Sequence, residues 1–174
     1  MQENNNGKEI RRGIQRYKVG DPILFNDLAD SFFTKNKEQV PIIHNNMKGR
    51  IEDFRLLEAG KVTERIQFDI EIDKPLMNLD DKDLDFQVIG VSEKGNSIIR
   101  FEVYKNKSTD EDDDSVSKNM VPFQIAYAVS IHKAQGLEYD SVKIIITDDI
   151  DELITHSIFC LLYTSPSPRD VEES

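Results

Sequence analysis

The chain has 174 residues, and its 33 acidic residues outnumber its 22 lysine and arginine residues to give a formal net charge of -11. This balance excludes a globally basic nucleic-acid binder but still allows local contacts with DNA. No stretch approaches the ~18 apolar residues of a membrane span, so we expect no membrane partner. The single cysteine, Cys160, provides no disulfide framework, which predicts a cytoplasmic protein.

Residues 1–16 form a polar N-terminal segment that begins with an asparagine run. The cations Arg11, Arg12, Arg16 and Lys18 lie within this segment or just after it. They suit contacts with a DNA backbone. They also suit a solvated linker or helix segment that leads into the next domain.

Residues 17–117 show the pattern of a small β-barrel. Short apolar or alternating runs are separated by turn residues, which predicts several half-buried strands. The expected strands are Gly20–Phe25, Pro41–His44, Gly49–Phe54, Arg65–Ile72 and Ser97–Tyr104. Asparagine and glycine tolerate positive φ, so Asn45–Gly49 is expected to form a tight turn. Phe68 and Phe101 are expected in the barrel core rather than as platforms for stacking bases.

Two acidic runs interrupt this region, at Asp80–Asp85 and at Asp110–Asp114. The second run belongs to an acidic loop over residues 108–117. Neither run has the glycine and terminal glutamate spacing of an EF-hand. We therefore expect solvated loops and no metal site.

The most informative segment follows the expected barrel and comes directly before the apolar run Val142–Thr147. It crowds five polar or charged residues around one glycine, Gly136: Ser130, His132, Lys133, Gln135 and Glu138. The first three side chains can donate to the phosphate oxygens of a nucleic acid. Gly136 lets the backbone approach a ligand closely, and Gln135 offers both a donor and an acceptor. Glu138 can accept a hydrogen bond from a ribose hydroxyl.

A simpler interpretation is a polar helix end with Gly136 as its C-terminal cap and Lys133 near the negative end of the helix dipole. Capping requires the glycine and favours the lysine, but it does not require Gln135 or Glu138. The whole segment therefore favours a ligand site over a cap.

The run from Ser130 to Tyr139 resembles motif V of superfamily-one DNA helicases, with its nearest likeness in the RecD-like and UvrD-like groups. The resemblance implies an ATP-dependent helicase that uses ATP and Mg²⁺ and moves on single-stranded DNA. It places Ser130, His132 and Lys133 near the DNA. It places Gln135, Gly136 and Glu138 toward ATP.

The same resemblance implies a fold class that is mainly β with an α+β arrangement. An SH3-like β-barrel insertion over residues 17–117 would be followed by a partial RecA-like α/β domain over residues 118–159. In the barrel, Gly20-Asp21 would open the first strand and Asn45–Gly49 would form the characteristic turn.

Residues 160–174 resemble the conceptual translation of a sequencing-library adapter. The alternative is a genuine flexible tail rich in serine and proline. Cys160 and Ser165 occupy the positions of the tyrosine and arginine of helicase motif VI, so no motif VI role is carried over to this tail.

We expect no complete catalytic set in the chain. It contains no Gly-x-x-x-x-Gly-Lys-Ser/Thr loop to cradle a nucleotide phosphate, and motif VI is missing. The expected function is that of an ATP-dependent DNA helicase fragment that is inactive alone. Three alternatives remain open. One is a fragment of a nuclease or DNA-processing ATPase with a helicase core, and another is a non-enzymatic SH3-like interaction module. The third is a nucleotide-binding α/β protein that does not touch DNA.

Overall fold

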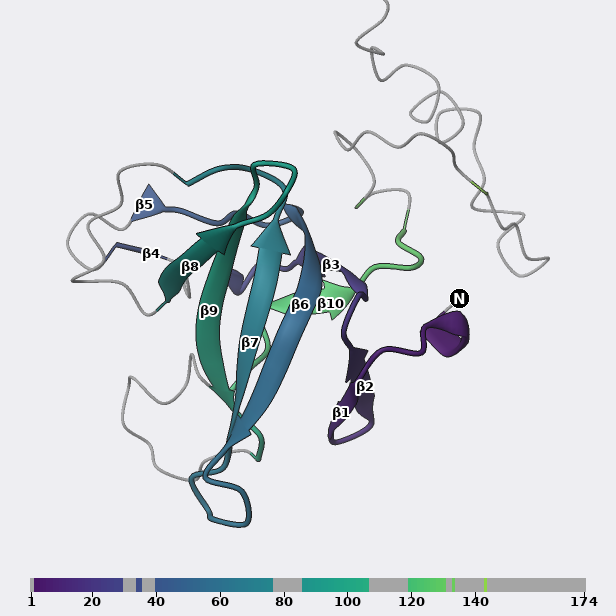
Figure 1. The fold of residues 1–174 in the computed structure, drawn as a ribbon, viewed down its shortest axis with the longest axis vertical. Coiled ribbons are helices and arrows are strands. Elements are labelled where there is room, and N and C mark those ends of the chain that lie inside the picture. Colours follow the sequence, from purple (N-terminus) through teal and green to yellow (C-terminus); the bar gives the residue numbers. More distant parts are fainter. Residues whose placement is uncertain are drawn as a thin grey trace, which may run out of the picture. The chain divides into compact units, whose positions relative to one another are not determined.

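The protein is mainly β in the part of the chain that the structure describes. A computed structural model describes residues 2–29, 34–35, 40–76, 86–106, 119–130, 133 and 143. These residues include one 3-10 turn, η1 (Gln2–Asn4), and the strands β1 (Glu9–Arg12), β2 (Gln15–Lys18), β3 (Pro22–Phe25), β4 (Thr34–Lys35), β5 (Val40–Pro41), β6 (Lys48–Leu57), β7 (Arg65–Ile72), β8 (Gln87–Val91), β9 (Ser97–Tyr104) and β10 (Phe123–Ile125) (Figure 1). The chain divides into two units, Met1–Tyr127 and Ala128–Ser174, and all the strands among the described residues lie in the first, which we call the β unit.

Six strands form one antiparallel sheet in the order β10-β3-β6-β7-β9-β8. The remaining four strands form two antiparallel hairpins, β1-β2 and β4-β5. The last strand, β10, pairs with β3, the first strand of the sheet along the chain. The chain therefore leaves the sheet beside the point where it enters.

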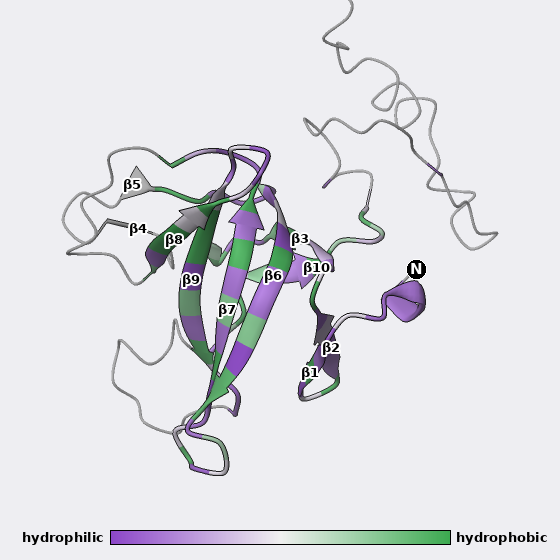
Figure 2. Ribbon diagram, in the orientation of Figure 1, coloured by the Kyte–Doolittle hydropathy of each residue, from purple (hydrophilic) through white to green (hydrophobic). Residues whose placement is uncertain are grey.

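The central strands β7 and β9 follow the period-two pattern expected of a sheet with one buried face. Ile66, Phe68 and Ile70 are fully buried, whereas Gln67 is partly exposed on the opposite face. Figure 2 shows this alternation as green and purple bands along β7. Burial of the apolar set fixes the register, because a slip by one residue would turn those side chains to solvent.

A β-bulge in β6 explains why that strand departs from strict alternation. Ile51 pairs with Ile70, and Asp53 pairs with Asp69, which is adjacent to Ile70. Glu52 is therefore an extra residue in β6. The bulge shifts the phase of the strand. As a result Ile51 and Phe54, three positions apart, are both buried.

The core is built around the ring of Phe68. Its centroid lies 5.2 Å from that of Phe123, 5.4 Å from that of Tyr17 and 6.0 Å from that of Phe101. The first two pairs are edge-to-face, an arrangement that aromatic rings favour beyond the area they bury. These rings come from β2, β7, β9 and β10, so one cluster holds most of the β unit together.

Charged pairs cover the opposite face of the same strands. Arg100 donates two hydrogen bonds to Asp69, each 2.7 Å long, and the two residues face each other across β7 and β9. Arg50 donates to Glu71 at 2.8 Å between β6 and β7. Both carboxylates are largely buried, so their bonded arginines provide the partners that buried charges need.

The mainly β class is confirmed, and so are four expected strands. The segments expected at Gly20–Phe25, Arg65–Ile72 and Ser97–Tyr104 contain β3, β7 and β9, and the segment expected at Gly49–Phe54 lies within β6. The expectation for Pro41–His44 was wrong beyond its first residue, because β5 ends at Pro41. No helix among the described residues is long and apolar enough to cross a bilayer.

The expected turn is confirmed at Asn45–Asn46, whereas Lys48 and Gly49 already belong to β6. Asn46 adopts a φ of 65°, the left-handed conformation that asparagine tolerates best after glycine. Gly49 then passes close to β7, where an added Cβ would lie 2.8 Å from the carbonyl oxygen of Glu71. The glycine is therefore needed for close packing of β6 on β7.

The polar N-terminal segment forms a hairpin, not a linker or a helix. β1 and β2 pair in a register that sets Ile10 opposite Tyr17, and Tyr17 is buried in the core. The turn between them has two residues, and its first, Gly13, has a φ of 58°, as hairpin turns of this length require. The expected domain boundary at residue 17 therefore falls inside a hairpin.

The described residues do not support the partial RecA-like α/β domain expected over residues 118–159. Phe123–Ile125, which begins that range, is a strand of the antiparallel sheet. Phe123 is buried against Phe68, so the β unit continues past residue 117 to Tyr127. Most of residues 131–159 and the tail at 160–174 lie outside the described residues, as do both acidic runs.

Phe68→Ala should lower the free energy of unfolding by about 3–5 kcal/mol, because it opens a cavity at the centre of the aromatic cluster. Chemical denaturation followed by circular dichroism measures the change. Val62→Ala, at an exposed turn position, is the matched control and should change stability by less than about 0.5 kcal/mol. Equal effects of the two substitutions would show that Phe68 is not the centre of the core.

Candidate functional site

The most unusual polar group in the β unit is Asp21, whose exposed fraction is 0%. It lies in the turn between β2 and β3, directly before Pro22, and proline biases the preceding residue toward an extended conformation. A buried carboxylate is costly unless hydrogen bonds replace its water. The structure therefore has to supply donors to this side chain.

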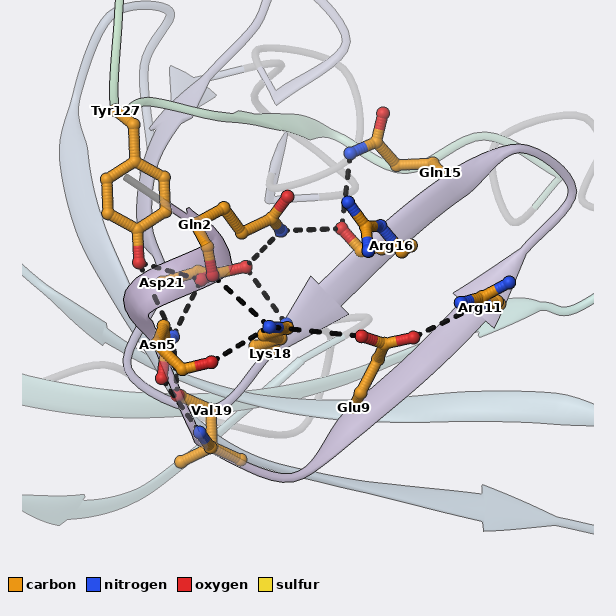
Figure 3. Close-up of polar contacts among 11 residues, drawn as sticks. Gln2, Asn5, Glu9, Arg11, Gln15, Arg16, Lys18, Val19, Asp21 and Tyr127 are labelled. Carbon is orange, nitrogen blue, oxygen red and sulfur yellow. Dashed lines mark hydrogen bonds and ion pairs between the residues drawn. The ribbon is translucent and has the colours of Figure 1, made fainter.

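Asp21 accepts four hydrogen bonds, two on each oxygen (Figure 3). Oδ1 accepts from Asn5 Nδ2 at 2.8 Å and from the Tyr127 hydroxyl at 2.9 Å. Oδ2 accepts from Gln2 Nε2 at 2.7 Å and from the backbone N of Lys18 at 2.9 Å. These bonds fill the ordinary accepting capacity of a carboxylate, so Asp21 has a positioning role rather than that of a general base.

The side chain of Lys18 binds the same group of residues. Its Nζ donates to the carbonyl oxygens of Gln2 at 3.2 Å and Asn5 at 2.8 Å, and it lies 4.0 Å from Glu9 Oε2. Figure 3 shows Lys18 between the N-terminal turn and Glu9. We call Gln2, Asn5, Lys18, Asp21 and Tyr127 the Asp21 cluster.

The backbone ties the Asp21 cluster to the sheet. The Asp21 carbonyl accepts from Ile51 N at 3.0 Å, and Ile51 O accepts from Gly20 N at 2.7 Å. On the other side of β3, Ala126 N donates to Pro22 O at 2.8 Å. The cluster thus holds both the start of the sheet and the chain that leaves it.

The Asp21 cluster perturbs the pKa of Tyr127. Partial burial of the ring and the hydrogen bond to Asp21 raise the pKa of the Tyr127 hydroxyl, and the bond from Asn5 opposes this effect. Burial likewise raises the pKa of Tyr17 in the core. The neutral phenol of Tyr127 is therefore the form that the cluster stabilises.

The residues expected to bind DNA and ATP lie in the second unit. Ser130 is exposed, and Lys133 is partly buried and has interactions of its own. His132, Gln135, Gly136 and Glu138 lie outside the described residues. The site expected for DNA and ATP therefore stays a prediction.

Sequence reasoning missed the Asp21 cluster. The one local signal was an aspartate between glycine and proline ahead of an apolar strand, which is a common turn sequence. Its donors come from residues 2, 5, 18 and 127, which no sequence spacing connects. Among the described residues, no group of three or more histidine, cysteine, aspartate or glutamate side chains could hold a metal ion.

Comparison with known proteins yields no relative. No family model, no curated protein sequence and no solved structure matches the chain. Its function is therefore inferred from its own residues and their geometry.

Asp21→Asn should lower the free energy of unfolding by about 2–3 kcal/mol, because an amide NH₂ group replaces an oxygen that accepts two hydrogen bonds. Tyr127→Phe should cost about 1 kcal/mol, since it removes one bond and leaves Asn5 to supply the other on that oxygen. Urea unfolding measures both. Asp73→Asn, at an exposed position, is the control for the change from acid to amide, and a cost as large as that of Asp21→Asn would contradict the role of the cluster.

The raised pKa of Tyr127 predicts a loss of stability in alkali. The folded protein holds this proton more tightly than the unfolded chain, so the contribution is complete below the ordinary tyrosine pKa of about 10 and is lost as pH rises through the folded value. Unfolding free energies measured from about pH 8 to about pH 11 should fall less steeply for Tyr127→Phe than for the unaltered chain. Tyr17 is present in both proteins, so the difference between the two slopes reports Tyr127. Identical slopes would refute the prediction.

Proposed function

We propose that the chain is part of an ATP-dependent DNA helicase in which the β unit is an SH3-like barrel inserted into a RecA-like domain. The observation that carries this proposal is the run from Ser130 to Tyr139, which matches the motif V pattern at several polar positions and at its glycine. Those residue types are the ones that a loop touching both a phosphate backbone and a nucleotide requires.

The geometry of the β unit supports an insertion. β10 pairs with β3, and Ala126 N donates to Pro22 O, so the two ends of the sheet lie side by side. A domain whose ends are close can be placed within another domain without separating the flanking segments. A small antiparallel unit with adjacent ends is what this arrangement needs.

The β unit also fixes the chain just ahead of the proposed motif. β10 ends at Ile125, and the hydroxyl of Tyr127 is bonded to buried Asp21. Ser130 follows only three residues later. The Asp21 cluster therefore fixes the chain as far as Tyr127, three residues ahead of Ser130 in the sequence.

In the proposed parent protein, Ser130, His132 and Lys133 contact the backbone of single-stranded DNA. Gln135, Gly136 and Glu138 face ATP, whose hydrolysis with Mg²⁺ supplies the free energy for movement along DNA. The chain supplies one coupling loop and no complete catalytic set, so it is inactive alone. The compartment that suits this activity is the cytoplasm.

Three other functions compete with the helicase, one of which is a nucleotide-binding α/β protein that does not touch DNA. A nuclease or DNA-processing ATPase with the same core would use the same loop. A non-enzymatic SH3-like module would use the β unit alone, and the antiparallel fold of the described residues also suits such a module.

The test uses the longer protein encoded by the contiguous gene. Gln135→Ala and Glu138→Ala should each reduce ATP hydrolysis stimulated by single-stranded DNA by about 10²-fold, the usual cost of losing one aligned polar group at a reacting phosphate. Steady-state ATP turnover with and without DNA measures the effect. Gln87→Ala on β8 removes the same amide at an exposed position and should leave turnover unchanged.

If single-stranded DNA stimulates ATP turnover equally in the unaltered protein and in both motif variants, the non-enzymatic interaction module explains the chain better than the helicase. ATP turnover that is lost in these variants but never responds to single-stranded DNA would point to a nucleotide-binding protein that does not act on DNA. Turnover that responds to DNA together with strand cleavage would favour the nuclease.

A further inference from the structure

The β1-β2 hairpin concentrates positive charge in an acidic chain. Residues 8–18 contain five cations and one carboxylate, a net charge of +4, whereas the whole chain carries -11. Charge of this sign gathered on one element attracts anionic ligands locally even when the protein as a whole repels them.

Three of the five cations serve to attach the hairpin. Lys8 is bonded to Asp53 at 3.1 Å and lies over the ring of Phe54. Arg12 donates to the carbonyl oxygens of Tyr104, at 2.8 Å, and Asn119. Lys18 belongs to the Asp21 cluster. These contacts fix the hairpin against the rest of the β unit.

The other two cations, Arg11 and Arg16, lie directly opposite each other in the register of the hairpin. Like charges in opposed positions destabilise a hairpin, so folding alone does not explain this pair. The side chain of Arg11 is 68% exposed, and it shares Glu9 with Lys18 (Figure 3). Within the part of the chain that the structure describes, no carboxylate lies at ion-pair distance from Arg16.

The tip of the hairpin presents an apolar side chain to solvent. Ile14, directly after the turn glycine, has an exposed fraction of 105%. The turn between β6 and β7 also carries an exposed apolar residue, Val62 at 93%. That second tip is flanked by Glu58 and Glu64, so the two tips differ in charge rather than in apolar exposure.

We propose that the β1-β2 hairpin binds the sugar-phosphate backbone of a single nucleic-acid strand. Arg11 and Arg16 contact phosphates, and Ile14 lies against a sugar or the face of a base. Arginine suits phosphate because its planar guanidinium forms two parallel hydrogen bonds. An apolar surface beside such cations suits the alternation of charged and apolar faces along a single strand. The inference rests on the proposed function for the kind of ligand.

Glu9 competes with the proposed ligand for the guanidinium of Arg11. A hydrogen bond from Arg11 is the main cause that lowers the pKa of Glu9, so the carboxylate is charged at neutral pH. Phosphate must displace this bond of 2.9 Å in order to reach the guanidinium. Removal of the carboxylate charge should therefore strengthen binding.

The experiment measures fluorescence anisotropy of a labelled single-stranded oligonucleotide with the full 174-residue chain over a range of salt concentrations. The double variant Arg11→Ala/Arg16→Ala should weaken binding by about tenfold or more, and the salt slope should fall by about 1.4, since each lost phosphate contact on a single strand removes about 0.7. Ile14→Ala should weaken binding and leave the salt slope unchanged. Glu9→Gln should tighten binding.

Lys61→Ala and Val62→Ala at the β6-β7 turn are matched controls and should bind like the unaltered chain. Thermal melting of every variant confirms that folding is retained, since the substituted side chains lie on the surface of the hairpin. No binding by the unaltered chain, or equal binding by the double variant, would overturn the proposal. Equal competition by polyglutamate would also overturn it, in favour of an acidic protein segment.

The outcomes separate this inference from the helicase proposal. Hairpin-dependent binding together with ATP turnover indifferent to DNA would keep the hairpin site and reject the helicase. DNA-stimulated turnover that needs Gln135 and Glu138, together with unchanged binding in the double arginine variant, would keep the helicase and reject the hairpin site.

Discussion

The pairing of β10 with β3 is the constraint on which the rest of the β unit depends. It joins strands about a hundred residues apart in the chain, so its loop-closure cost has to be met by packing. Phe123 provides that packing through contacts with the rings of Phe68, Tyr17 and Phe25. Without β10, β3 would be an unpaired edge and the aromatic cluster would lack one of its rings.

The Asp21 cluster adds a polar constraint at the same place. A hydrophobic contact tolerates small displacements, whereas a buried carboxylate with four donors has only one satisfactory arrangement. The donors come from the N-terminal turn, from β2 and from the chain beyond β10. Three separate segments are therefore held in one geometry at the point where the chain leaves the sheet.

The sequence predicts the fold well where one face of a strand is buried and the other is not. The alternation in Arg65–Ile72 and Ser97–Tyr104 predicts the bounds of β7 and β9 to the residue, because every inward position except Ser97 is apolar. β1 and β2 were missed since arginines mask their two apolar positions. β10 was assigned to the following domain because its membership in the core depends on Phe68, far away in the sequence. The partners of Asp21 likewise lie too far apart along the chain for any local pattern to reveal them.

The Asp21 cluster is also joined by hydrogen bonds to the β1-β2 hairpin, to which we assign contacts with nucleic acid. Gln2 Nε2 donates both to Asp21, at 2.7 Å, and to the carbonyl oxygen of Arg16, at 3.1 Å. A continuous path of hydrogen bonds therefore runs from Tyr127, through Asp21 and Gln2, to the strand that carries Arg16. Coupling between sites needs such a physical connection together with an element that has two arrangements. The β unit provides such a connection between the hairpin and Tyr127, its last residue.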